Sequence, residues 1–283
     1  MSGLLQEPVL LVLIALLGLL AGVLGGLLGV GGSVVMIPGL AFLFSISDRL
    51  EPNQHLFQAS AMIVNVVVSI PAMMRHRRAG VLVGDVLMWM LPAALVCILL
   101  GVWISNLPVF AGADGGRWLG RLLALFLVYV IGLNICRLRS TQSSETPDGM
   151  CLSPVRGLTV GAVMGTVAGL LGIGGGAVAV PLQQVLMKLP LRQCIGNSSA
   201  VICLSAGVGA IYKNATLGQH VDTTVISWQS SLLIAALLSP TAWLGARLGA
   251  GLTHRLPLRQ VRLAFICLMA VAAWKMAGFP DPF

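Results

Sequence analysis

Long apolar runs, separated by short polar or glycine-rich stretches, make up nearly the whole chain. Several of them reach the ~20 residues that an α-helix needs to cross the hydrocarbon core of a bilayer. Two runs, 33–46 and 176–187, are too short to cross comfortably, and each follows a glycine-rich break. Open strands cannot satisfy their backbone polar groups in lipid, so the runs predict helices. The predicted helices lie at about residues 9–29, 33–46, 58–74, 82–104, 117–136, 154–173, 176–187, 195–213, 226–249 and 258–278.

Composition agrees with this pattern. Of the 283 residues, 57% are hydrophobic and 9% are charged, whereas a soluble domain carries about 25% charged residues. The net charge of +8 does not indicate nucleic acid, because Lys and Arg lie mostly at the ends of the apolar runs and form no long basic stripe. The first run is not preceded by a basic segment, so we expect a retained helix and not a signal peptide. The sequence therefore predicts a multi-pass membrane protein whose solvent is lipid.

A 17-residue segment occurs twice. Residues 22–38 read GVLGGLLGVGGSVVMIP and residues 165–181 read GTVAGLLGIGGGAVAVP, with 9 identities at a constant offset of 143. Weaker matches follow, between Ala59-Ser60-Ala61 and Ser198-Ser199-Ala200 and between 92–108 and 240–257. The chain therefore divides into a first repeat, 1–139, a cytoplasmic linker, 140–153, and a second repeat, 154–283.

The basic and acidic residues predict an orientation. Lys and Arg concentrate on the cytoplasmic side of membrane proteins. That rule can be satisfied throughout if each glycine-rich break is the tip of a helical hairpin. The fold class is then an all-α polytopic membrane protein of two inverted repeats, each a glycine-broken hairpin plus three transmembrane helices, with both termini periplasmic. The cytoplasmic ends would carry Arg75, Arg77, Arg78, Arg137, Arg139, Arg156, Lys188, Arg192, Arg255 and Arg259, and the opposite side Asp48, Glu51, Asp114, Asp222 and Asp281.

The two breaks are candidate anion sites. A helix that starts after a break presents free N–H groups and the positive end of its dipole. Two such ends meeting near the midplane would bind an anion. The alternative is that the glycines only allow close helix packing, and Gly18, Gly22 and Gly26, spaced four apart, fit that alternative well. The candidate binding residues are Gly31, Gly32, Ser33, Gly174, Gly175 and Gly176.

Polar side chains inside the apolar runs extend this candidate site. Uncharged donors suit a permeating anion because they can bind it without holding it too long, although each could instead make a helix–helix hydrogen bond. Arg75, Lys213 and Arg247 lie near helix ends, where we expect them to reach the headgroups; an electrostatic funnel for anions is the alternative. The candidates are Ser60, Asn65, Asn197, Ser198 and Ser199.

Other kinds of site lack the residues they require. No Asp or Glu lies deep in a predicted span, which argues against a carboxylate-based cation site. The four histidines lie at predicted ends or loops. The six cysteines form no C-x-x-C pair and are interpreted as small hydrophobic residues. No phosphate-binding loop, H-E-x-x-H or G-x-S-x-G motif is present, so we expect no enzyme, no metal and no cofactor.

The doubled motif, GLLGVGGSVVMIP and GLLGIGGGAVAVP, resembles the TauE/SafE sulfite exporter family over roughly residues 8–278. The resemblance implies a bacterial inner-membrane carrier for small anions, chiefly sulfite and organosulfonates, working by alternating access between the halves. Its alternatives are an anion channel and a non-transporting biogenesis or sensor subunit. The expected partners are the anion and membrane lipid, with a homodimer left open. The family motif falls on Gly29, Gly31, Gly32 and Pro38 and on Gly172, Gly174, Gly175, Gly176 and Pro181, with Ser33 standing where the second repeat has Gly176.

Overall fold

The computed structural model of the protein describes residues 8–46, 53–110, 112–139, 152–219 and 227–253, with single residues between 257 and 277. Regular structure in these ranges is entirely helical. Nearly all of the predicted linker and most of the predicted helix 258–278 lie outside the described residues. The α-helices are α1 (Pro8–Leu28), α2 (Ser33–Ile46), α3 (Gln54–Arg78), α4 (Gly84–Ser105), α5 (Gly112–Arg139), α6 (Pro154–Leu171), α7 (Gly176–Leu186), α8 (Leu191–Thr216) and α9 (Trp228–Leu252), joined by the short 3-10 helices η2 (Pro108–Phe110) and η3 (Leu217–Gln219).

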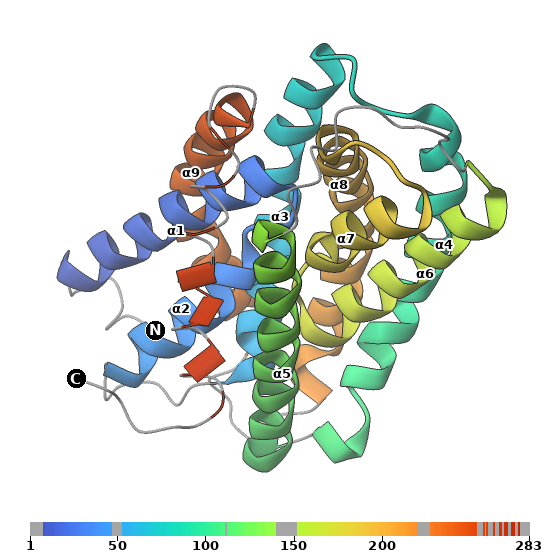
Figure 1. Cartoon of the computed structure of the whole chain (residues 1–283). Helices are drawn as coiled ribbons and strands as arrows, with labels where there is room; N and C mark the ends of the chain where they lie inside the picture. Colours follow the sequence, from blue (N-terminus) through green and yellow to red (C-terminus); the bar gives the residue numbers. More distant parts are fainter. Residues whose placement is uncertain are drawn as a thin grey trace.

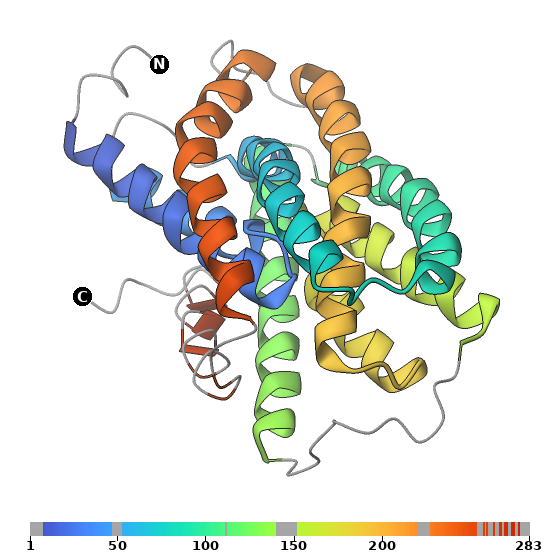
Figure 2. The same cartoon turned by 90° about the horizontal axis from the view of Figure 1, so that it is seen from above.

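Seven of these helices are long and apolar enough to cross a membrane, whereas α2 and α7 are shorter apolar helices. The prediction of an all-α membrane protein is therefore confirmed, including the two short segments that follow the breaks. Helix α3 and helix α8 are the most buried: 72% and 67% of their apolar stretches are buried, against 28–44% in the other five. Figures 1 and 2 show α1 beside α9 on one side of this central pair and α4 beside α6 on the other, with α5 standing across the bundle.

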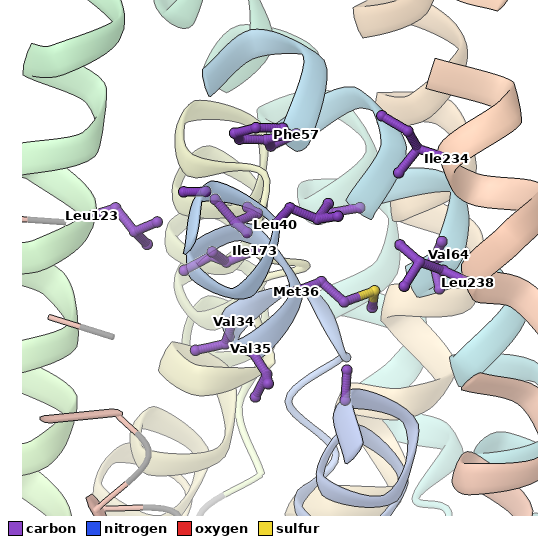
Figure 3. Packing of buried hydrophobic residues seen from close by; sticks show 14 of the residues in the cluster. Val34, Val35, Met36, Leu40, Phe57, Val64, Leu123, Ile173, Ile234 and Leu238 are labelled. Atoms are coloured by element: carbon purple, nitrogen blue, oxygen red, sulfur yellow. The ribbon is translucent and has the colours of Figure 1, made fainter. Parts of the chain in front are cut away.

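The short helix α2 lies in the middle of the main hydrophobic core. Its residues Val34, Met36 and Leu40 are buried. Figure 3 shows them among side chains from α3, α5 and α9, together with a residue of the second break. A helix that is apolar on every side is stable only where it is surrounded by protein or lipid, which explains why α2 carries no polar face. The neighbouring side chains labelled there are Phe57, Val64, Leu123, Ile173, Ile234 and Leu238.

Rows of small residues join the outer helix pairs. A Cβ atom placed on Gly18, Gly22 or Gly26 of α1 would collide with the backbone of α9. On the other side of the bundle, α6 packs in the same way against α4. The expectation that the glycines of α1 allow close helix packing is therefore confirmed, and the same holds for Gly161, Gly165 and Gly169 of α6.

Gly22→Ala is expected to destabilise the protein. The new methyl group would fall on the Ala242 backbone of α9, and overpacking of this kind costs about 1–3 kcal/mol. Thermal unfolding of the purified protein in detergent should show a fall in Tm of roughly 5 °C. The matched control is Gly132→Ala on α5, where an added Cβ meets nothing within 4 Å; a fall in Tm no larger than that of the control would contradict this account of the contact between α1 and α9.

Candidate functional site

Both helix breaks depend on glycine. Gly29 and Gly31 adopt φ angles of 63° and 81°, and Gly172 and Gly174 adopt 74° and 73°. Residues with a side chain rarely occupy this left-handed region, whereas glycine does so readily. Helix α1 therefore ends at Leu28 and α6 at Leu171, and a new helix starts after a few residues. The predicted breaks are confirmed.

The two breaks touch each other in the interior. A Cβ atom placed on Gly176, the first residue of α7, would fall on the Gly29 carbonyl and 2.7 Å from Cα of Val30. Each break also rests on one of the two central helices: Gly29 lies against Ile195 of α8, and Gly172 against Gln58 of α3. The expectation that the two breaks converge on one place is met by these contacts.

Asn65, in the middle of α3, lies against both breaks. A Cβ atom on Gly31 would be 2.9 Å from its Oδ1, and one on Gly174 would be 2.9 Å from its Nδ2. The Ser33 N–H at the start of α2 donates to Asn65 Oδ1 at 3.1 Å, and Asn65 Nδ2 donates to Ser33 Oγ at 2.8 Å. Asn65 and Ser33 are both fully buried. One amide side chain therefore fixes the start of α2 and contacts the second break.

Ser198 of α8 makes a further contact with the first break. Its Oγ donates to the Gly29 carbonyl at 2.8 Å and lies 3.1 Å from the Ile195 carbonyl. This hydroxyl satisfies a carbonyl group that the end of α1 leaves without an intrahelical partner. Ser198 therefore belongs, with Asn65 and Ser33, to the polar side chains gathered at the breaks.

The start of α7 offers backbone donors at the same place. The first backbone hydrogen bonds recorded for this helix are made by Val178 and Ala179, whose N–H groups donate to the Gly175 carbonyl. The N–H groups of the two preceding residues, Gly176 and Ala177, have no acceptor within the helix. Gly176, Ala177 and Val178 are buried. The positive end of this 11-residue helix is thus directed into the protein interior beside the first break.

Two other candidates, Ser60 and Ser199, are bonded elsewhere. Ser60 Oγ donates to the Leu56 carbonyl of its own helix and approaches Ser231 of α9 at 3.4 Å. Ser199 Oγ donates to the carbonyl of Ile195 four residues back. Such bonds within or between helices are the alternative to anion binding for these side chains.

Asn197 joins other segments. Its Oδ1 accepts from the Val83 N–H ahead of α4 at 2.9 Å, and its Nδ2 donates to Gln183 of α7 at 3.2 Å. The remaining break glycines pack closely: a Cβ on Gly32 would collide with Met36, and one on Gly175 with the Met164 carbonyl. Pro38 and Pro181 lie inside α2 and α7.

Gln58 was missed from the sequence. It is fully buried, and its side chain lies against Gly172 while Nε2 donates to the Leu170 carbonyl at 3.3 Å. Its Oε1 has no hydrogen-bond partner among the described residues. The only signal in the sequence was an amide residue two positions before Ser60 in an apolar run.

Lys213 overturns an expectation. The sequence predicts that Lys213 reaches the headgroups. In the structure its side chain is 1% exposed, and Nζ hydrogen-bonds three uncharged side-chain groups. The prediction was wrong because the last turn of α8 is covered by the ends of α3 and α4. Arg75 and Arg247 are exposed, as that expectation requires.

No group of three His, Cys, Asp or Glu side chains that could hold a metal ion occurs in the part of the chain that the structure describes. The site at the breaks is built from backbone donors, the hydroxyls of Ser33 and Ser198, and the amides of Asn65 and Gln58. Such a set is chemically suited to a small anion, which hydrogen-bond donors and helix N-termini can hold without a fixed cation.

Known proteins resemble this chain over most of its length. It is 26% identical to the "Probable membrane transporter protein MamO" of Magnetospirillum gryphiswaldense, over 93% of this chain and 44% of that protein. It thus spans less than half the length of this relative. It is 26% identical to a "Probable membrane transporter protein" of Haemophilus influenzae, over 94% and 97% of the two chains, and 22% identical to YunE of Bacillus subtilis, over 88% and 91%.

No solved structure matches the chain significantly. The family model described as "Sulfite exporter TauE/SafE" matches residues 14–276, which include both glycine breaks and every candidate residue named above. The chain therefore belongs to the TauE/SafE sulfite exporter family.

Proposed function

We propose that the protein exports a small sulfur-containing oxyanion or organosulfonate, with sulfite as the leading candidate, across a bacterial inner membrane. The anion would rest where the two glycine breaks meet and be exposed to each side in turn. The observation that carries this proposal is the contact of Asn65 with both breaks, beside the buried N–H groups at the start of α7. These groups supply donors without a charge that would retain the anion.

Alternating access requires two halves that can exchange roles, and repeated contacts support such halves. Gly101 of α4 lies against Thr166 and Leu170 of α6, as Gly249 of α9 lies against Val23 and Leu27 of α1. Val23 and Leu27 of α1 lie 143 positions before Thr166 and Leu170 of α6, which is the offset of the repeated segment. Gly101 lies 148 positions before Gly249, which is also the spacing between Pro92 and Pro240. Each half thus places its first helix against the fourth helix of the other half. We propose that the halves are inverted repeats, with both termini periplasmic and Arg75, Arg77 and Arg78 of α3 on the cytoplasmic side.

Export of an anion would be driven by the membrane potential. With the inside negative, outward movement is favoured by about 2.3 kcal/mol per charge per 100 mV. Export can therefore run without a coupled ion. No acidic side chain lies in the middle of a described helix to suggest a coupling site for uptake.

The test is flux into and out of proteoliposomes of the purified protein. Sulfite, sulfate, thiosulfate and taurine are supplied in turn, with empty liposomes as the background. We expect saturable flux of sulfite, driven outward by an inside-negative potential, with at least a tenfold preference over sulfate. A non-saturating flux with discrete unitary currents would indicate a channel. Absence of flux and of binding for all four would contradict the transport proposal.

A further inference from the structure

A polar cluster lies buried where α3 begins and α4 and α8 end, away from the breaks. Lys213 Nζ contacts Ser105 Oγ at 2.7 Å, Asn106 Oδ1 at 2.9 Å and His55 Nδ1 at 2.9 Å. His55 Nε2 lies 2.8 Å from the Phe110 carbonyl and must donate to it, which leaves Nδ1 as the acceptor for the ammonium. Lys213, Ser105 and His55 are all buried. We call these four side chains, Lys213, His55, Ser105 and Asn106, the Lys213 cluster.

Among the described residues, the Lys213 side chain is held by neutral groups. An ammonium has three donors, and its three partners are a hydroxyl, an amide oxygen and a neutral imidazole. Burying a charge costs several kcal/mol unless an opposite charge or excellent hydrogen bonds offset it. The carboxyl ends of α4 and α8 supply part of that offset through their dipoles. A glutamine would join the same helix ends at a smaller desolvation cost, so the positive charge itself calls for an explanation.

The cluster lies on the same two central helices as the site at the breaks. His55 precedes Asn65 by ten residues on α3, and Lys213 follows Ser198 by fifteen on α8, or about 15 and 22 Å along a helix axis. Between them lies a small apolar layer made of Met62, Val102 and Ala210, with 6% exposure or less. Along α3 and α8, the hydrogen-bond donors at the breaks are therefore followed by the apolar layer and then by the Lys213 ammonium.

We propose that the Lys213 cluster is a second binding site for the transported oxyanion, at the end of the pathway where α3 begins. This inference rests on the proposed function, because it takes the anion at the breaks as the same substrate. When an anion arrives, its oxygens replace Ser105 Oγ and Asn106 Oδ1 on the Lys213 ammonium. Ser105 Oγ–H, which donates to the Val102 carbonyl at 2.8 Å, and Asn106 Nδ2, which donates to Thr216 Oγ1 at 2.8 Å, can then turn to the anion. In the absence of anion the protein's own oxygens occupy those places and keep this end closed. By the distribution of Arg residues on α3, this end faces away from the cytoplasm.

The test is the number of anions bound per chain, measured by equilibrium dialysis of ³⁵S-labelled sulfite without oxygen. The key variant is Asn106→Asp, which keeps the size of the side chain but places a carboxylate on Lys213; its second oxygen can accept from the Thr216 hydroxyl in place of the bond that Asn106 Nδ2 donates there. If Asn106 and Lys213 only hold the helix ends together, the new ion pair should leave the stability of the protein unchanged or raise it. If Lys213 binds an anion, the new carboxylate should block that site. The matched control is Asn134→Asp; among the described residues, Asn134 Nδ2 donates to the Val130 carbonyl of its own helix α5.

We expect two anions per chain for the wild type and for Asn134→Asp, and one for Asn106→Asp with an unchanged Tm. Lys213→Met removes the cation and should give the same loss if it folds. One anion per chain in the wild type, or two in Asn106→Asp, would overturn this second site and leave the proposed function standing. No binding by any protein would refute the proposed function, and this inference with it.

Discussion

Replacing Asn65 with aspartate is expected to lower anion affinity by about three orders of magnitude. The new carboxylate would keep the acceptor for the Ser33 N–H and the size of the side chain that contacts Gly31 and Gly174. It would also put a negative charge beside the bound anion. Two like charges about 4 Å apart repel by about 4 kcal/mol at an effective dielectric of about 20, and each ~1.4 kcal/mol is a factor of ten in affinity.

The measurement is sulfite binding and proteoliposome flux by Asn65→Asp, together with its Tm. Asn134→Asp on α5 adds the same charge away from the breaks and should retain wild-type flux. If Asn65→Asp transports at the wild-type rate while folding normally, the anion does not pass the helix breaks. If it loses both flux and Tm, Asn65→Gln separates the two effects, because it keeps the amide without a charge.

Gly176→Ser is expected to destabilise the protein by about 3 kcal/mol or more, although the first repeat carries Ser33 at the equivalent position. The Ser33 side chain is directed to Asn65, whereas a Cβ on Gly176 would collide with the Gly29 carbonyl. Backbone cannot move aside as a flexible side chain can, so the strain falls on the contact between the two breaks. At roughly 2–4 °C per kcal/mol, the Tm should fall by about 10 °C.

Ser33→Gly is the reciprocal control. It removes one hydrogen bond, worth about 1 kcal/mol, and causes no collision. The two substitutions should therefore differ by a factor of two or more in their effect on Tm. Equal effects would mean that the breaks do not touch at Gly176 in the way the contacts of the structure indicate.

Most of the helical architecture could be predicted from the sequence. The runs of apolar residues placed α1, α2, α6 and α7 to within about two residues. The adjacent glycines then marked the breaks, because closely spaced glycines are not needed on a single packing face. The chemical difference between Ser33 and Gly176 could be seen in the sequence, but the contacts of the two residues could not, since the partner of each comes from a distant segment.

The polar side chains were predicted less well. Sequence position alone could not distinguish Asn65, which contacts both breaks, from Asn197, whose amide joins Val83 and Gln183. Lys213 was misplaced because its partners Ser105 and His55 are 108 and 158 positions away in the chain. A cation near a helix end reaches solvent unless other helix ends cover it, and that depends on packing.

The contact between α1 and α9 also bears on how the protein is made. Gly22 and Ala242 pack against each other but lie 220 positions apart in the sequence. At about 5–20 residues per second, the ribosome needs roughly 11–44 s to synthesise α9 after α1. During that time the glycine face of α1 is in the bilayer without its partner, whereas α6 enters beside an α4 that already exists. The first helix therefore waits longer in lipid for its partner helix than α6 does, because its contact joins opposite halves of the chain.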